Sequence, residues 1–476
     1  MLSLFLDNIY KYFMDINSLK NLIGKNQLIS EPNKMSAYLN EPRKRFFKKA
    51  QAITLPKNVE QVQAIAKWAN KNKVAIIPQG GNTGLVGGQV PLSGNEIILS
   101  LKNLTSIREL KADHITVEAG LTLQALHTKS EQSKKIFPLT IASEGSAQIG
   151  GILASNAGGS QVLAYGNARQ LCLGIEAVLA DGSLYNGLGS LKKDNTGYDL
   201  NNLLIGSEGS LAIITAAKLK LFPKPLSYET ALVAFDNPFL AYEFFKHIQS
   251  SAQNNLTAFE LIPRFGLDIQ LKHKMLDQDP SAGLSPWYSL IEISHHNKLN
   301  ENLLSNELEY AFSQNLIGEA TTIAQSEFER ENMWKFREQM SECQNCEGAS
   351  IKHDVSVPVE KVPELIEMGI KAIAKINPNI RPCPFGHMGD GNIHFNFTQP
   401  KGMEAKTFMD NAQPIHDAIY EVVIRLNGSI SAEHGIGQLK RELLIKTKDK
   451  TALAMMKTIK AALDPNNILN PGKILF

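Results

Sequence analysis

Two dense glycine-rich loops constrain the fold of this chain more than any other feature. The first, PQGGNTGLVGG, follows the apolar run Val74–Ile77, and the second, EGSAQIGGILASNAGG, spans residues 144–159. Glycine takes positive φ without strain and lets backbone N–H groups approach an anion closely, so such loops bind phosphate. One loop alone would also fit a plain hairpin. Two such loops in one domain favour a ligand that carries a pyrophosphate and a ring and needs backbone contacts at both ends.

A Rossmann dinucleotide site is the obvious rival for the first loop. That fingerprint requires G-x-G-x-x-G opening directly into a helix. Here Pro91, Ser93 and Gly94 follow within a few residues, and EIILSL then has the pattern of another strand. A Rossmann site is therefore disfavoured.

The remaining pattern predicts two different regions. Helical periodicity covers Ile16–Ile23 and Val59–Lys71. From Val74 onward, short apolar runs between glycine-rich turns, QIGGILASNAGG among them, predict strands and turns of a mixed α/β domain. The prolines of FPKP at Phe222–Pro225 predict a boundary. Beyond it, YETALVAF and WYSLIEIS predict strands, AYEFFKHIQ predicts a helix, and Glu442–Ala462 is strongly helical.

Composition excludes several classes of protein. The 476 residues are enough for two or three domains, and the net charge of 49 − 47 = +2 gives no electrostatic footprint for nucleic acid. Four cysteines in so long a chain argue against a disulfide framework and favour the cytoplasm. Met1–Phe13 is apolar but too short to span a bilayer. It predicts a surface or interfacial helix, so a peripheral membrane location is the alternative.

The stretch PFGHMGDGNIHFNF, residues 384–397, predicts a metal or substrate site. On a strand, Asn392, His394 and Asn396 share one face, and the Gly389–Gly391 turn can return His387 beside His394. Two imidazoles could then face one ion. Taken alone, the pattern fits a polar strand face equally well.

A third ligand is available downstream. SISAEHGIG supplies the adjacent pair Glu433 and His434 just before a helix, where an acid is also favourable for the helix itself. Two imidazoles and one carboxylate with an open position describe a catalytic zinc site, and equally a non-haem iron triad. The residue types leave the metal and the individual roles open.

The order of the motifs resembles the flavoprotein family of vanillyl-alcohol oxidase and p-cresol methylhydroxylase, and within it the D-2-hydroxyacid dehydrogenases. The resemblance runs from about Ile53 to the end and rests on GGNTGLVGGQVP, GGILASNAGG with YG, DNTGYDL, IGSEGSLAIIT and NPGK. It implies an α+β fold: a two-subdomain FAD-binding domain, an α+β substrate domain and a C-terminal helical segment returning to the flavin domain. The implied divisions are a helical segment at 1–50, the FAD domain at 51–225, the substrate and metal domain at 226–427 and the C-terminal segment at 428–476.

The resemblance implies that FAD is the cofactor. Because Val74–Ser100 contains no histidine, attachment through that loop is excluded and non-covalent binding is expected. The positions that correspond to the FAD site are Pro78, Gly80, Gly81, Asn82, Thr83, Gly84, Leu85, Gly87, Gly88, Gln89, Gly145, Ser146, Gly150, Gly151, Ser155, Asn156, Gly158, Gly159, Gly209, Ile213 and Asn470.

The resemblance also assigns the metal and the catalytic base. GHMGDGNIHFN and SAEHG resemble the metal and substrate motifs of the dehydrogenase branch. Carried over, His387, His394 and Glu433 would bind zinc. Asn396 and His434 would face the substrate, with His434 as the general base.

A hydroxy acid also needs cations for its carboxylates. W-x-x-R-E followed by K-x-D-x-S-x-P resembles the substrate-binding segments of the branch, where Arg337 and Lys352 hold carboxylate; taken alone, both would be solvated charges. Ser341 stands where relatives carry threonine and keeps a hydroxyl for the substrate. His353 stands where tyrosine is common and would alter the polarity of the pocket. Cys343-x-x-Cys346 has no matching second pair and is expected to be inert.

The implied activity is an FAD- and zinc-dependent dehydrogenase for a D-2-hydroxy acid. D-2-hydroxyglutarate is the implied substrate, and D-lactate or glycolate is the alternative. Electrons would pass to an acceptor protein of the electron-transfer flavoprotein type or to a quinone. A flavin-free metal oxygenase or hydrolase would leave both glycine-rich loops unexplained, and a scaffold protein would bind neither flavin nor metal. The sequence does not determine the oligomeric state, and a homodimer is one arrangement.

Overall fold

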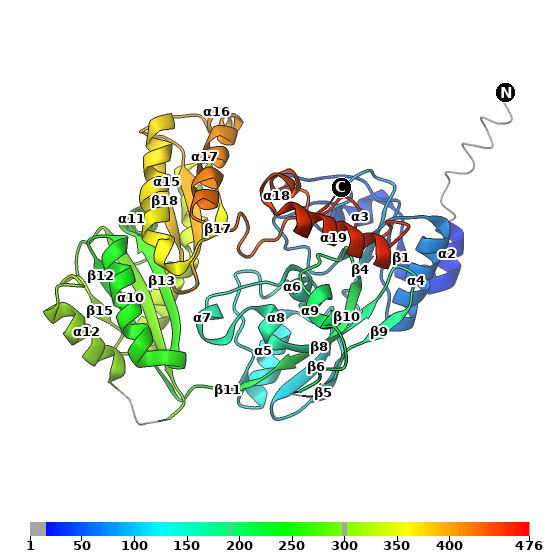
Figure 1. The fold of residues 1–476 in the computed structure, drawn as a ribbon, viewed down its shortest axis with the longest axis horizontal. Helices are drawn as coiled ribbons and strands as arrows, with labels where there is room; N and C mark the ends of the chain where they lie inside the picture. Colours follow the sequence, from blue (N-terminus) through cyan, green and yellow to red (C-terminus); the bar gives the residue numbers. More distant parts are fainter. Residues whose placement is uncertain (1–15, 190, 192, 298–301, 476) are drawn as a thin grey trace. The chain divides into compact units, whose positions relative to one another are not determined.

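The computed structural model describes residues 16–189, 191, 193–297 and 302–475 of the chain (Figure 1). The helix expected at Met1–Phe13 lies outside these residues. Contacts divide the chain into two compact units. Unit 1 comprises residues 1–157, 167–222 and 433–476, and unit 2 comprises residues 158–166 and 223–432. Residues 158–166 and 428–432 thus group with unit 2, whereas the division implied by the resemblance placed them with the flavin and C-terminal parts.

Unit 1 contains two sheets of different type. In the four-stranded sheet, ordered β1-β2-β4-β3, strands β2, β4 and β3 run parallel, whereas the five-stranded sheet, ordered β5-β6-β10-β8-β9, is antiparallel. The strands are β1 Leu28–Ile29, β2 Ala52–Thr54, β3 Ile76–Gln79, β4 Ile97–Ser100, β5 Ile107–Leu110, β6 His114–Glu118, β8 Cys172–Val178, β9 Leu184–Asn186 and β10 Ile213–Lys220; β7 Lys135–Ile136 pairs separately with β11 Phe222–Pro223.

Helices cover these sheets and close unit 1. In α4, the Asn58 side chain accepts the Gln61 N–H at 3.0 Å and so caps the first turn, and Lys73 in the left-handed region ends the helix. The helices of unit 1 are α2 Ile16–Ile23, η1 Lys25–Gln27, α3 Pro32–Leu39, α4 Val59–Asn72, α5 Leu123–Gln132, α6 Ile149–Ser155, α8 Ala168–Leu171, α9 Leu200–Leu204, α18 Arg441–Thr447 and α19 Lys450–Leu463.

Two local expectations for unit 1 are wrong. QIGGILASNAGG contains a helix, α6, because Ile149, Ile152 and Leu153 bury one face at helical spacing and Asn156 ends the helix in the left-handed region. The expected single C-terminal helix is two helices, α18 and α19. The chain becomes extended at Lys448, and the Asp449 side chain then caps α19 by accepting the Ala452 N–H at 2.9 Å.

Unit 2 is built on one eight-stranded sheet. Its order is β15-β12-β14-β13-β18-β19-β16, and β17 also pairs with β19. The strands are β12 Ser227–Phe235, β13 Leu256–Pro263, β14 Trp287–His295, β15 Thr322–Ile323, β16 Ser350–Ile351, β17 Asp354–Ser356, β18 Arg381–His387 and β19 Asn392–Thr398. Strands β18 and β19 form a hairpin in which Phe385 pairs with His394.

The two faces of this sheet pack against different helices. Ile393, Phe395 and Phe397 point into the core formed with α10, α15 and α17, whereas Phe385 packs with α13 and α14 on the other face. The helices of unit 2 are α7 Val162–Tyr165, α10 Pro238–Ala252, η2 Gln253–Asn255, α11 Arg264–Lys272, α12 Leu303–Ser313, α13 Glu327–Glu338, α14 Met340–Cys343, η3 Gln344–Glu347, η4 Val359–Lys361, α15 Val362–Ile376, η5 Met388–Asp390, α16 Ala405–Asp410 and α17 Ala412–Arg425. Within the described residues, every helix is too short or too polar to cross a membrane.

Candidate active site

A pocket in unit 1 lies among the loop that follows β3, helix α6 and the turn that precedes β10. No helix follows the loop among residues 80–96, so the arrangement differs from a Rossmann site. The residues of the expected FAD site that line the pocket are Pro78, Gly80, Gly81, Asn82, Thr83, Gly84, Gly88, Gln89, Gly150, Gly151, Ser155, Gly209, Ile213 and Asn470.

The other expected positions do not line the pocket. Ser146 backs the loop at Gly81, and the Asn156 side chain accepts the Arg169 N–H at 3.0 Å. Gly87 has φ +72°, and a Cβ there would lie 2.6 Å from the Phe46 ring. Those outside the lining are Leu85, Gly87, Gly145, Ser146, Asn156, Gly158 and Gly159, the last two belonging to unit 2.

The donors and acceptors of this pocket suit a dinucleotide. Asn82 Oδ1, Gln148 Oε1 and Asn470 Oδ1 are buried and have no hydrogen-bond partner among the described residues. Such atoms are rarely left unpaired in a folded protein, because each costs about 1–3 kcal/mol of desolvation. A bound ligand with N–H and O–H groups would satisfy them, so the residues present fit FAD. Gln148 and Glu208 also line the pocket, although neither is among the individual positions expected for the FAD site.

Gly81 should be indispensable for this pocket. An ideal Cβ at this position would lie 1.8 Å from the Ser146 carbonyl oxygen, which is backbone and cannot rotate away. Replacing Gly81 with alanine should therefore abolish flavin binding, measured as absorbance of the purified protein. Gly189 is the matched control, since a Cβ there meets no atom within 4 Å. Retention of flavin by G81A would contradict this account of the loop.

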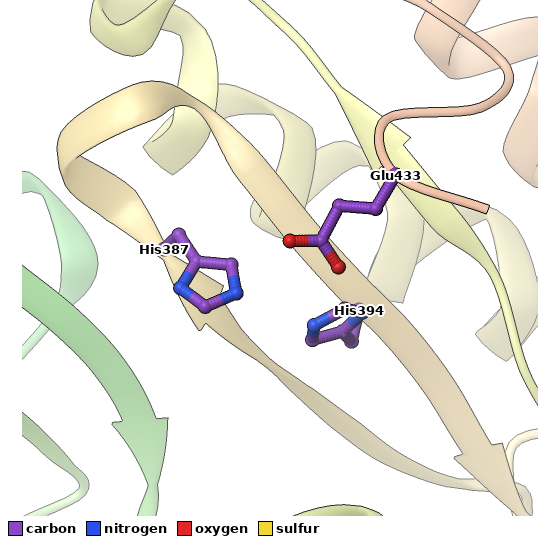
Figure 2. Close-up of side chains that lie close together, drawn as sticks. All are labelled: His387, His394 and Glu433. Atoms are coloured by element: carbon purple, nitrogen blue, oxygen red, sulfur yellow. The ribbon is translucent and has the colours of Figure 1, made fainter. Parts of the chain in front are cut away.

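The hairpin of β18 and β19 brings the two predicted histidine ligands together. Their ring centroids lie 5.6 Å apart, and the Glu433 carboxylate reaches toward both rings from a separate stretch of chain (Figure 2). One ligand atom from each of His387, His394 and Glu433 lies within 4.8 Å of the other two. Glu433 directly follows the last residue of unit 2, and that chain is anchored where the Ser429 N–H donates to the Ser356 carbonyl at 2.7 Å.

A buried carboxylate that the sequence analysis missed orients one of these ligands. His387 Nδ1 donates to Glu260 Oε1 at 2.7 Å, so neutral His387 presents the lone pair of Nε2. A carboxylate behind a ligating histidine is the usual support of a metal site. This donor set therefore fits a divalent cation such as zinc. The signal for Glu260 in the sequence is a lone acid in the apolar strand LTAFELIP.

Glu260 also links the histidine to a predicted substrate residue. Arg337 Nε donates to Glu260 Oε2 at 2.7 Å, and its guanidinium lies 5.0 Å from the centre of the Phe385 ring. Burial raises the pKa of Glu260, but its interactions with Arg337 and His387 outweigh burial and lower it to about 2. Glu260 is thus an anion that accepts hydrogen bonds from both residues. Arg337 is buried on the sheet rather than solvated.

The remaining predicted substrate residues lie on the same side of unit 2. Lys352 Nζ donates to the Ser341 carbonyl at 2.7 Å and to Ser341 Oγ at 3.2 Å, so these two residues meet. Asn396 is buried on β19, and its Oδ1 has no partner among the described residues. Such an amide is available to a bound hydroxy acid.

His353 does not face this side of the sheet, contrary to the expectation that it alters the substrate pocket. Its Nδ1 donates to the Phe395 carbonyl at 2.8 Å, and His416 Nδ1 then donates to its Nε2 at 2.8 Å. His353 thus points toward α17, which carries His416. The histidine therefore belongs to the packing of the helix layer.

The four cysteines are free thiols. Burial raises the pKa of Cys343 to about 12, which keeps this thiol protonated and unreactive. Cys346 is exposed and lies at the end of the same short helical stretch.

The metal group and the pocket use adjacent residues of the chain. His434, the predicted base, lines the pocket of unit 1, and Glu433 belongs to the group with the two histidines.

Comparisons with known proteins identify both parts. Residues 50–187 match the family model of an FAD binding domain, and residues 224–474 match that of the C-terminal domain of FAD linked oxidases. A solved structure of p-cresol methylhydroxylase with bound substrate has a TM-score of 0.76 at 17% identity and covers 96% of both chains. The fold is thus α+β, as expected, and of the vanillyl-alcohol oxidase type, and the protein is an FAD-dependent oxidoreductase.

Relatives that match over most of both chains narrow the class of protein further. A D-2-hydroxyglutarate dehydrogenase of Xanthomonas citri pv. viticola is 34% identical over 461 residues, which are 96% of each chain. The mitochondrial D-2-hydroxyglutarate dehydrogenase of Danio rerio is 38% identical over 423 residues, 88% of this chain and 77% of the relative. The chain therefore belongs to the family of FAD-linked D-2-hydroxyacid dehydrogenases.

Proposed function

We propose that this protein is an FAD- and zinc-dependent dehydrogenase that oxidises D-2-hydroxyglutarate to the 2-oxo acid. The single observation that carries the proposal is the meeting of His387, His394 and Glu433, with the next residue, His434, lining the flavin pocket. The substrate is that named for the relatives of Xanthomonas citri and Danio rerio.

The two bound groups would supply complementary chemistry. FAD, bound non-covalently, would supply a hydride acceptor for C2 of the substrate. Zinc, held by His387, His394 and Glu433, would supply a Lewis acid that lowers the pKa of the C2 hydroxyl. Another divalent metal would serve the same role, since two imidazoles and a carboxylate do not select zinc alone.

The side chains of the protein supply the remaining steps. His434 accepts the hydroxyl proton at a ring nitrogen, a role that imidazole commonly takes as a general base. Asn396 faces the substrate, with its unpartnered Oδ1 as an acceptor. Arg337 and Lys352 attract the carboxylates and fix which face of C2 meets the ring, while Ser341 orients Lys352 through the two bonds described above.

D-lactate or glycolate is the second candidate substrate. Lys352 Nζ is already hydrogen-bonded by Ser341, and Arg337 Nε by Glu260. A monocarboxylate would not require both cations to turn toward the ligand. A smaller substrate is therefore compatible with the arrangement of these side chains.

Anaerobic flavin bleaching decides between the substrates. Purified protein is mixed with D-2-hydroxyglutarate, D-malate, D-lactate, glycolate and the matching L acids, and loss of the oxidised flavin absorbance is followed. We expect bleaching with the D acids and the highest kcat/KM for D-2-hydroxyglutarate. Preference for D-lactate or glycolate would establish the second candidate, and no bleaching by any acid would contradict both.

Glu260 gives a prediction for the proposed metal site. Replacing it with glutamine removes the charge behind His387, so zinc affinity should fall about 10–100-fold, measured by competition with a chelator. E292Q is the matched control, because Glu292 on β14 is also buried and accepts from Arg330 Nε at 2.8 Å, but it contacts no metal ligand. An equal loss of zinc in E292Q would mean that the effect is general destabilisation.

The proposal extends to the electron acceptor, the assembly and the location of the protein. Electrons would leave for an acceptor protein of the electron-transfer flavoprotein type or for a quinone, and the chain would form a homodimer. We propose the cytoplasm as its compartment, with membrane association as the alternative. The Danio rerio relative is named as mitochondrial, so fractionation of cells decides this point.

A further inference from the structure

Glu208 lies where the flavin pocket meets the segment that carries His434. It occupies the turn before β10, lines the pocket and has φ +50°, in the left-handed region. A non-glycine residue in this region is uncommon and marks a constrained position. No role has so far been assigned to this carboxylate.

The carboxylate holds two successive backbone amides of the C-terminal segment. Glu208 Oε1 accepts the Ile436 N–H at 2.7 Å, and Oε2 accepts the Gly437 N–H at 2.8 Å. Hydrogen bonds from backbone N–H to a carboxylate are of the strong, charge-assisted kind. The backbone of Glu208 is fixed as well, since its carbonyl accepts from Asn470 Nδ2 at 2.7 Å.

The segment is built for this close approach. Gly435 and Gly437 have φ +78° and +51°, and a Cβ on Gly435 would lie 2.8 Å from Glu208 Oε1. Two glycines give the backbone next to His434 wide conformational freedom. A carboxylate that holds the two following amides restricts that freedom. Burial raises the pKa of Glu208, opposed by the two N–H groups and by Lys440 and Lys473.

We propose that Glu208 is a positioning residue, whose carboxylate fixes the backbone at Ile436 and Gly437 and thereby holds His434 at the pocket. This inference rests on the proposed function, in which His434 takes the proton from the substrate. Glu208 acts through the backbone and not on the substrate itself.

The test compares E208A, E208Q and E208D in flavin-loaded protein. A misplacement of about 1 Å in a catalytic group costs on the order of 100-fold, so kcat per bound flavin should fall about 10–100-fold in E208A, with KM nearly unchanged. E208Q keeps one side-chain oxygen, which can accept a single N–H. Its kcat per bound flavin should therefore lie between that of E208A and that of wild type. E208D reaches only one of the two amides and should behave like E208Q.

Hydrogen exchange gives a readout that does not depend on activity. In E208A, a peptide covering residues 433–440 should exchange faster at two amides, those of Ile436 and Gly437. E96A is the matched control, because Glu96 is also buried in unit 1 and accepts backbone N–H groups, from Leu92 at 2.9 Å and Ser93 at 2.8 Å. E96A should keep wild-type kcat per bound flavin and wild-type exchange in residues 433–440.

The possible outcomes separate this inference from the proposed function. If hydrogen exchange in residues 433–440 is unchanged in E208A, the proposed role of Glu208 is wrong. It is also wrong if a variant exchanges faster in these residues but keeps the wild-type kcat. Loss of flavin as the only effect would make Glu208 a cofactor residue and also overturn it. If wild type bleaches with no 2-hydroxy acid, the proposed function fails, and the exchange experiment still decides whether Glu208 holds the two amides.

Discussion

The variant His394→Ala should lose its zinc and more than about 100-fold of its activity while it keeps its yellow flavin. His394 projects from β19 on the face opposite Ile393 and Phe395, so its removal takes away one of three ligands without opening the core. Loss of a residue that only hydrogen-bonds to a metal ligand lowers metal affinity or activity about 10–100-fold. Loss of the ligand itself should lower both further. Zinc content, flavin absorbance and turnover are measured on the same preparation.

His416 supplies the control for this variant. It lies on α17, where its Nδ1 meets His353, and it is not part of the metal group. H416A should keep both zinc and flavin. Loss of metal and flavin together in H394A would mean that His394 supports the fold. Full retention of zinc would remove His394 from the ligand set.

The variant His434→Ala should lower kcat by roughly two to four orders of magnitude, the usual contribution of a general base. Because Glu433 and not His434 belongs to the predicted ligand set, zinc content should be unchanged. The pH profile of kcat/KM provides a second readout, since the limb that reports the base should disappear. Near-normal kcat with only a raised KM would make His434 a binding residue and leave the base unidentified.

Much of the fold could be predicted because local patterns agreed with it. The alternation of polar and apolar residues in NIHFNF placed His394 on one face and Phe395 on the other, as the structure shows. The helix expected at Ile16–Ile23 is α2, and it ends at Ile23 as expected. The loop after β3 opens into a strand and not a helix, because proline and glycine interrupt it.

Other features depended on tertiary contacts that no local pattern encodes. Helix α6 was missed, because its glycines lower helical propensity and only burial of Ile149 and Leu153 stabilises it. Glu260 was missed, since its partners Arg337 and His387 lie 77 and 127 residues away in sequence. The direction of His353 was not predicted, since it depends on hydrogen bonds to Phe395 and His416, which lie 42 and 63 residues away in sequence.

The most direct test of the central claim is an anomalous difference map from crystals of the flavin-loaded protein, collected on both sides of the zinc absorption edge. We expect one peak within about 2.0–2.2 Å of a ring nitrogen of His387, a ring nitrogen of His394 and a carboxylate oxygen of Glu433. A zinc-soaked crystal with no peak there, or with the ion on other residues, would contradict the account.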